Sequence, residues 1–230
     1  MVARRAAYLG ALGVTDWRQR RPLAVAGGSS SIALGAPIPA AVGPDTWDQV
    51  ALEVASCTRC ELHSCRNRTV FGVGDRDARW LVVGEAPGAE EDQQGEPFVG
   101  RAGRLLDSML LAIGLRRDQV FIANVLKCRP PGNRNPAPQE VAQCLPYLER
   151  QIALLRPSIL LAVGSIAAQN LLATDVPVGR LRGQLHAFGS ARTPLVVTYH
   201  PAYLLRSPGE KRKSWEDLKF ARRVAGGLSA

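Results

Sequence analysis

The sequence predicts an α/β fold in which helices cover both faces of a mostly parallel sheet. Short apolar runs at residues 80–84, 120–125, 158–163 and 195–199 each have the length of a buried strand. Segments with the 3.6-residue period of a helix separate these runs. Strands that alternate with helices in this way are typical of a parallel sheet between two helical layers.

Length and charge narrow the class of protein. At 230 residues the chain suits one domain of ordinary size with room for a tail, and such a domain buries most of its apolar surface. Lys and Arg outnumber Asp and Glu by 29 to 20, and the net charge of +9 favours an anionic partner, either nucleic acid or a membrane surface. No apolar run approaches the roughly 20 residues that span a bilayer, so we expect a soluble protein.

The first 43 residues differ in composition from the rest. Residues 1–22 are helix-like and carry five arginines, and residues 23–44 contain only Gly, Ala, Ser, Pro and apolar residues without charge, as flexible linkers do. We expect a retained basic helix rather than a transit peptide. The chain is therefore predicted to divide into a helix and linker, residues 1–43, and a domain, residues 44–230.

The domain is expected to begin with a helix that ends at a pair of cysteines. Asp45 is placed to cap it, and apolar residues from Trp47 to Ala55 repeat with helical period. The central strand, WLVVG at residues 80–84, then leads into a loop that carries four carboxylates at residues 85, 90, 91 and 92. Ligands bind at the carboxyl ends of strands in open α/β sheets, so this loop is placed for chemistry.

An aromatic residue follows in the sequence GEPFVG. Pro97 and the flanking glycines should hold Phe98 exposed, where its ring can serve as a stacking platform. The alternative is an ordinary loop whose acids are solvated and whose Phe98 fills the core. A second amphipathic helix covers residues 105–113, and Gly114 can end it in a left-handed conformation.

The later elements follow the same alternation. After the strand at 120–125, residues 127–136 (KCRPPGNRNP) are too rich in proline for regular structure and predict a stiff basic loop. Pro138 suits the first turn of the next helix, and Pro146 predicts a kink or restart after Cys144, because an internal proline costs about 3 kcal/mol. A helix through Leu172 follows the third strand. Residues 174–194 form a weakly patterned connection, and a basic helix after HPAYLLR closes the chain.

Five cysteines are spaced unlike a disulfide framework. Cys57 and Cys60 form a CxxC pair, whereas Cys128 and Cys144 lie far along the chain. Without an export signal, structural disulfides are disfavoured. The spacing leaves three alternatives open, an iron-sulfur cluster, a zinc site, or reduced core thiols, and favours the cluster. Cys65 is expected to be a bystander.

Six separated motifs resemble those of the family 4 uracil-DNA glycosylases: CTRC, GEAPGAEED, GEPFVGRAGRLLD, NVLKCRPPGNRNP, the later Cys144, and HPAYLLR. They occur in the family's order and cover about residues 45–223. The resemblance implies a four-stranded parallel sheet in an α/β/α sandwich and excision of uracil from DNA. It also implies a [4Fe-4S] cluster bound by Cys57, Cys60, Cys128 and Cys144.

The resemblance assigns roles to the residues of the predicted site. It implies that Glu85 and the Ala86 backbone lie in the loop that activates water, that Phe98 stacks on the flipped uracil and that Asn124 reads its amide edge. His200 would donate to the uracil O2 as negative charge develops.

The group that positions the water stays open. Other branches of the superfamily place Asp or Asn where this chain has Ala86. Glu85 or Glu91 is therefore expected to position the water, with Glu85 preferred. His63 and His186 are given no role.

DNA contacts are expected after His200. Leu204 lies where the family's wedge enters the base stack, although a core leucine is the alternative. Arg206, Lys211, Arg212 and Lys213 should contact phosphates unless they form a merely solvated helix. The cluster is expected to join the first helix to the proline-rich loop, so that Lys127 and Arg129 face DNA.

Two rival functions remain open at this stage. One is a subtype that stays covalently attached to its abasic product, against which the chain shows no basic insertion between Phe98 and Cys128. The other is an inactive iron-sulfur module that binds DNA or assists replication. The resemblance further implies a monomer that acts on single- or double-stranded uracil-containing DNA in a prokaryotic cytoplasm, near the nucleoid, and has no contact with a membrane.

Overall fold

The computed structural model describes residues 45–227, and the predicted basic helix and linker of residues 1–43 lie outside them. Within these residues, six strands form one mixed sheet in the order β1-β3-β2-β4-β6-β5. Their bounds are β1 Val73–Gly74, β2 Trp80–Gly84, β3 Phe121–Asn124, β4 Ile159–Val163, β5 Leu185–Phe188 and β6 Thr193–Thr198. The division of the chain at residue 44 stays a prediction.

The four strands predicted from apolar runs form the parallel centre of the sheet. β2 pairs with β3 and β4, and β4 pairs with β6, all in parallel, while β1 and β5 add antiparallel edges. The edge strands were missed because β1 has two residues and the side chains of β5 are exposed or half-buried. Neither strand has the continuous apolar run by which a buried strand is recognised.

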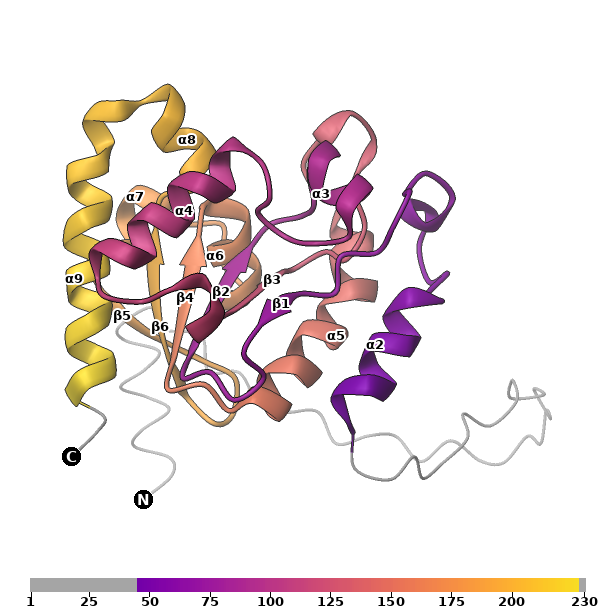
Figure 1. Cartoon of the computed structure of the whole chain (residues 1–230), viewed down its shortest axis with the longest axis horizontal. Coiled ribbons are helices and arrows are strands. Elements are labelled where there is room, and N and C mark those ends of the chain that lie inside the picture. The colour runs from indigo at the N-terminus through magenta and orange to yellow at the C-terminus, as the bar shows by residue number, and fades with distance from the viewer. Residues whose placement is uncertain (1–44, 228–230) are drawn as a thin grey trace, which may run out of the picture. The chain divides into compact units, whose positions relative to one another are not determined.

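Helices cover both faces of the sheet, as predicted (Figure 1). Alternate strand residues point to opposite faces, so Leu81 and Val83 join one core cluster and Val82 joins the other. One face packs against α2 Trp47–Ala55, α5 Pro138–Leu155, α6 Ser165–Leu172 and α7 Val178–Leu181. The other packs against α4 Arg101–Ala112, α8 Pro201–Arg206 and α9 Lys211–Gly227. In the described part of the chain, no helix is long and apolar enough to cross a bilayer.

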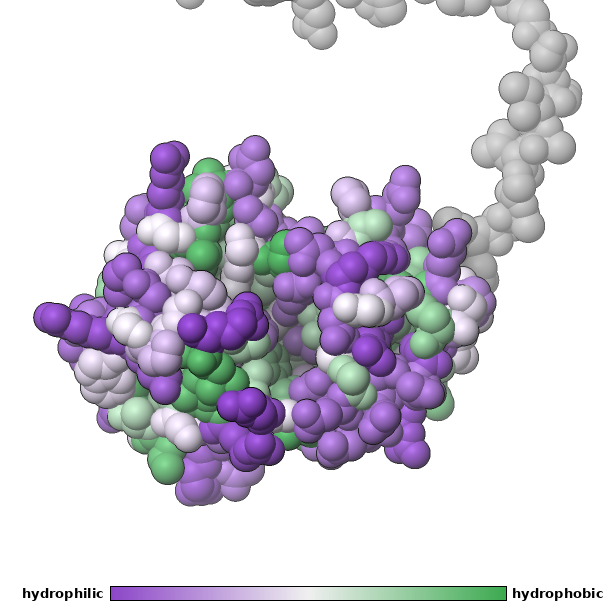
Figure 2. Space-filling view, turned by 90° about the horizontal axis from the view of Figure 1, so that it is seen from above, coloured by the Kyte–Doolittle hydropathy of each residue, from purple (hydrophilic) through white to green (hydrophobic). Residues whose placement is uncertain are grey.

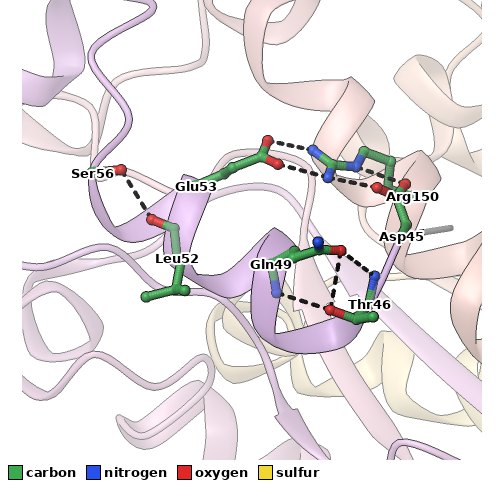
Figure 3. A network of polar contacts seen from close by, with 7 residues as sticks. All are labelled: Asp45, Thr46, Gln49, Leu52, Glu53, Ser56 and Arg150. Atoms are coloured by element: carbon green, nitrogen blue, oxygen red, sulfur yellow. Dashed lines mark hydrogen bonds and ion pairs between the residues drawn. The ribbon is translucent and has the colours of Figure 1, made fainter. Parts of the chain in front are cut away.

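Helix α2 is fastened to α5 by one arginine (Figure 3). The guanidinium of Arg150 donates to both oxygens of Asp45, at 2.9 and 2.8 Å, and to both of Glu53, at 2.5 and 2.9 Å. The cap of α2 is Thr46, which exchanges hydrogen bonds with Gln49, so the prediction that Asp45 caps this helix is wrong. Because Asp45 is bound by Arg150, it orients the helix that leads to Cys57 and Cys60.

Three other local predictions are corrected. Helix α5 begins with Pro138 as predicted, and it runs on through Pro146, so the helix does not restart after Cys144. Ala142, whose carbonyl would accept the missing bond from residue 146, is exposed, so water can serve that carbonyl. The connection at 174–194 contains α7 and β5, and the proline-rich loop contains a short 3-10 turn, η3 Pro131–Asn133.

Candidate active site

A cavity of about 460 Å³ lies where the parallel strands end. Its walls come from the segments that follow β2, β3 and β6, and from the proline-rich loop with η3. Figure 2 looks onto this end of the molecule and shows a hollow between two raised parts with largely hydrophilic rims. The sheet brings together residues far apart in sequence, and the predicted ones among those that line the cavity are Glu85, Ala86, Glu91, Phe98, Asn124, His200 and Arg206.

Phe98 is buried rather than exposed, yet its ring still faces the cavity. The ring stacks against the imidazole of His200, with centroids 5.6 Å apart and planes at 29°. Two glycines make this arrangement possible. A Cβ on Gly84 would lie 2.7 Å from the Phe98 ring and 2.4 Å from Asn124 Oδ1, and a Cβ on Gly103 would lie 1.7 Å from the Phe98 carbonyl.

Glu91 braces the loop that carries Phe98. Its Oε2 accepts from the N–H of Gly88 at 3.1 Å, and its Oε1 accepts from Val99 at 3.1 Å and Gly100 at 3.3 Å. Both oxygens are therefore engaged with backbone on either side of the aromatic residue. A carboxylate held in this way positions the loop more readily than it positions a water.

Arg117 holds the same loop from the other side. Its guanidinium donates to the carbonyls of Pro97 at 2.5 Å and Phe98 at 3.3 Å, and it pairs with Asp107 at 3.0 Å. Phe98 adopts a φ of 55°, a left-handed conformation that costs a residue with a Cβ about 1–3 kcal/mol unless its surroundings impose it. Here Arg117 donates to the carbonyl of the strained Phe98, and Glu91 accepts from the N–H groups of the two residues that follow it.

Glu85 lines the wall of the cavity. Its carboxylate accepts no hydrogen bond from the described residues. Burial raises the pKa of Glu85 above its ordinary value. The backbone carbonyls of Gly84 and Glu85 accept from Val125 and Leu126, each at 3.0 Å, which ties this loop to the end of β3.

Asn124 ends β3 with its side chain almost fully buried. Its Oδ1 is one of two buried side-chain oxygen or nitrogen atoms of the described chain that lack a hydrogen-bond partner. Leaving a buried acceptor unpaired costs about 1–3 kcal/mol. Since Asn124 lines the cavity, a donor on a bound molecule can satisfy this oxygen.

His200 is a neutral donor by its geometry. Its Nδ1 accepts from the N–H of Ala202 at 3.1 Å, so the neutral ring carries its proton on Nε2. Burial, with a smaller contribution from the positive charge of Arg206, lowers the pKa of His200 to about 4, and Glu91 opposes that shift. The imidazole is therefore uncharged near neutral pH and offers an N–H.

Four of the five cysteines line a second, smaller hollow between α2, the proline-rich loop and α5. They are the four predicted ligands, Cys57, Cys60, Cys128 and Cys144, and all are free thiols. Arg66 Nη1 donates to Cys128 Sγ at 3.2 Å, and the backbone N–H of Lys127 donates to Cys144 Sγ at 3.2 Å. Cys65 is exposed and does not line this hollow.

Burial disfavours the thiolate form of three of these thiols. Burial raises the pKa of Cys60 and Cys128, and raises that of Cys144 to about 11. A cation bound by the sulfurs would offset this cost and stabilise the thiolates. Among the described residues, no three Cys, His, Asp or Glu side chains are arranged to hold a single metal ion.

The family model of the uracil DNA glycosylase superfamily matches residues 71–219. A type-4 uracil-DNA glycosylase of Archaeoglobus fulgidus is 41% identical over 188 residues, which cover 79% of this chain and 94% of the relative. The type-4 enzyme of Pyrobaculum aerophilum is 42% identical over 76% of this chain and 91% of its own length. That of Sulfurisphaera tokodaii is 40% identical over 79% of this chain and 86% of its own length.

The chain belongs to the uracil-DNA glycosylase superfamily. The family predicted from the motifs is thereby confirmed, together with the α/β class.

The residues of this glycosylase that are predicted to contact DNA differ in their exposure. Leu204 is 1% exposed and packs in the core, so the residue expected to act as the wedge does not reach the surface. Arg206 is exposed and lines the cavity, as a phosphate contact should. Lys211 and Arg212 are exposed at the start of α9 but lie outside the cavity wall, and Lys213 pairs with Glu210 at 2.8 Å.

Lys127 does not face DNA, contrary to the prediction. Its side chain is 1% exposed, and its Nζ donates to the backbone carbonyl of Asn124 at 2.9 Å and to Gln151 Oε1 at 2.6 Å. Burial lowers the pKa of Lys127 to about 8. The lysine supports the turn between Asn124 and the cysteine-bearing loop, while Arg129 is half-buried and donates to Asn133 at 2.8 Å.

Sequence reasoning missed Arg117 and Arg66 as parts of the two sites. Arg117 sits in RRDQ and Arg66 in CRNR, where neither neighbouring residues nor spacing distinguishes them from surface arginines. Their partners, the carbonyl of Pro97 and the sulfur of Cys128, are 20 and 62 residues away. Only the folded chain brings these groups together.

Proposed function

We propose that the cavity binds an extruded uracil and that the chain hydrolyses the N-glycosidic bond which joins it to DNA. The unpaired Oδ1 of Asn124, set beside the Phe98 and His200 rings, is the observation that carries this proposal. The membership in the uracil-DNA glycosylase superfamily supports the reaction class. Stacking of duplex DNA hides the bond, so the nucleotide must leave the stack at a cost of a few kcal/mol.

Asn124 suits discrimination between uracil and cytosine. The N3–H of uracil can donate to Oδ1, and the amide nitrogen can donate to the uracil O4. Cytosine presents an acceptor at N3 and an amino group at C4, so both hydrogen bonds would be opposed. A site built to pair one polar edge rejects a base with the opposite pattern, because its own buried groups stay unpaired.

His200 and Glu85 suit the two charges that develop as the bond breaks. Negative charge grows on the departing uracil, and the Nε2–H of His200 is the donor that we assign to its O2. One such preorganised donor contributes about 10²–10³ in rate. Positive charge grows on the sugar, and Glu85, with the Ala86 backbone beside it, is the group that we assign to orient the attacking water. Glu91 serves as the brace of the Phe98 loop.

The four thiols of the second hollow are proposed to hold a [4Fe-4S] cluster. Their convergence from three segments and the two N–H groups that donate to sulfur support an anionic thiolate site. The cluster would fasten the end of α2 to the proline-rich loop, and excision would need no redox step from it. Iron, sulfide and zinc analysis of the purified protein, with its visible absorption, tests this assignment against a zinc site.

The proposed substrate is uracil-containing DNA, bound by the exposed cation Arg206 beside the cavity and by Lys211 and Arg212 on α9. Phosphate contacts of this kind make affinity fall with rising salt. A monomer that acts in the cytoplasm close to the chromosome stays a prediction. Size-exclusion chromatography with light scattering and fluorescence microscopy of a tagged chain would check it.

A uracil-release assay on single-stranded and U:G duplex oligonucleotides tests the proposed reaction. Free uracil and an alkali-labile abasic strand are expected from both substrates, with none from thymine or cytosine controls. A denaturant-resistant protein–DNA adduct would instead identify the covalent subtype. Binding without any released uracil would identify an inactive DNA-binding module and would overturn the proposal.

A further inference from the structure

The departure of a base from the stack leaves a gap that an inserted side chain can fill. Leu204, four residues after His200, is buried in the core and cannot fill it without unpacking α8 from α4. The exposed large hydrophobic side chains near it are Tyr203, 37%, Leu205, 36%, and Trp215, 39%, which shares a hollow with Leu204. Of these three, Tyr203 lines the uracil cavity and the other two do not.

Tyr203 is held in place before DNA arrives. Its ring packs against the ring of Tyr199, with centroids 5.1 Å apart and planes at 41°. The guanidinium carbon of Arg182 lies 5.3 Å from the centroid of the Tyr199 ring. Arg182 is itself held by two hydrogen bonds that it donates to the Asp217 carboxylate, at 2.9 and 2.8 Å. The ring that faces the cavity therefore rests on a rigid support, which lowers the entropy lost when it is ordered against a base.

The backbone of α8 places this ring next to the donor of the reaction. The N–H of Tyr203 donates to the carbonyl of His200 at 2.9 Å, so the two residues occupy one helical turn. Arg206 follows on the same wall of the cavity, where it can hold a phosphate. A strand whose nucleotide enters the cavity would thus pass beside an aromatic face and a cation.

We propose that Tyr203 is the side chain that enters the base stack when uracil is extruded, in the place expected for Leu204. This inference rests on the proposed function of the same cavity. An aromatic ring stacks on any base with a gain equivalent to about 5- to 150-fold in binding. The ring can therefore hold the opened duplex regardless of the flanking sequence.

The test compares duplex and single-stranded substrates in single-turnover excision. Tyr203→Ala is expected to lower the ratio of the duplex to the single-strand rate constant by about 5- to 150-fold, because only the duplex must be opened. Tyr203→Phe should restore the ratio, since stacking needs the ring and not the hydroxyl. Leu205→Ala, an exposed neighbour outside the cavity, is the matched control and should keep the wild-type ratio.

Several outcomes overturn the inference. An unchanged ratio in Tyr203→Ala would do so, and so would an equal loss in Leu205→Ala. A uracil placed opposite an abasic analogue has no partner base to unpair, so Tyr203→Ala should recover on that substrate, and a persistent deficit would contradict the role. Failure of the wild-type chain to release uracil from either substrate would instead remove the proposed function. Circular dichroism melts show whether each variant is folded.

Discussion

Removing the guanidinium of Arg117 should misplace Phe98 without touching a group that contacts uracil. Arg117→Ala deletes two charged hydrogen bonds to the carbonyls of Pro97 and Phe98 and the ion pair with Asp107. Hydrogen bonds to charged groups contribute about 1.5–3 kcal/mol each, and the left-handed conformation of Phe98 stores about 1–3 kcal/mol. Loss of one such bond is enough to let that strain relax.

The expected consequence is a loss of stacking rather than a loss of fold. A reacting group displaced by about 1 Å lowers rate by about 100-fold, so the single-turnover rate constant should fall by about 10- to 100-fold. Inhibition by free uracil should weaken in parallel, because the ring that covers the base has moved. Arg117→Lys, which can reach one carbonyl, should show a smaller loss.

A neighbouring arginine provides the control. Arg116 precedes Arg117, is 65% exposed and pairs with Asp118 on the surface, so Arg116→Ala removes the same charge without reaching Phe98. It should keep the rate within about twofold, since exposed pairs of this kind contribute about 0–1 kcal/mol. Equal rates in Arg117→Ala and wild type, with unchanged inhibition by uracil, would show that Arg117 does not position Phe98.

Further expected outcomes concern the acids, the imidazole and the thiols. Glu85→Gln should lower single-turnover excision by about 10²–10⁴, and if Glu85→Gln and Glu91→Gln both kept the wild-type rate, no carboxylate would position the water. Burial raises the pKa of Glu85, so on acidification the wild-type activity should begin to fall at a higher pH than it would with an ordinary glutamate. The pH profile of Glu85→Gln should lack this acidic fall. The pKa of His200, about 4, lies below its ordinary value, so the ring stays neutral and no inflection of rate is expected between about pH 6 and 8; an inflection there that vanishes in His200→Asn would contradict its neutral role. Cys144→Ser should remove iron and visible colour while Cys65→Ser keeps both, and equal iron in the two variants would exclude Cys144 as a ligand.

The sequence was sufficient for the features that depend on local pattern. Apolar runs identify the four central strands because a strand buried on both faces has no polar position to interrupt it. Alternation with helices makes those strands parallel, and parallel strands end at one edge, so Glu85, Asn124 and His200 could be expected to lie together. The motifs that contain these residues also identified the family.

The tertiary structure decided which face each side chain presents and which partner it finds. Leu204 and Tyr203 are adjacent in one short helix, and only the packing of α8 against α4 directs the first into the core and the second into the cavity. Lys127 is buried because Gln151 and the carbonyl of Asn124 meet its ammonium group, and Glu91 is a brace because Val99 and Gly100 turn their amides toward it. Local pattern encodes periodicity, whereas these outcomes depend on contacts between elements that only the completed fold brings within hydrogen-bonding distance.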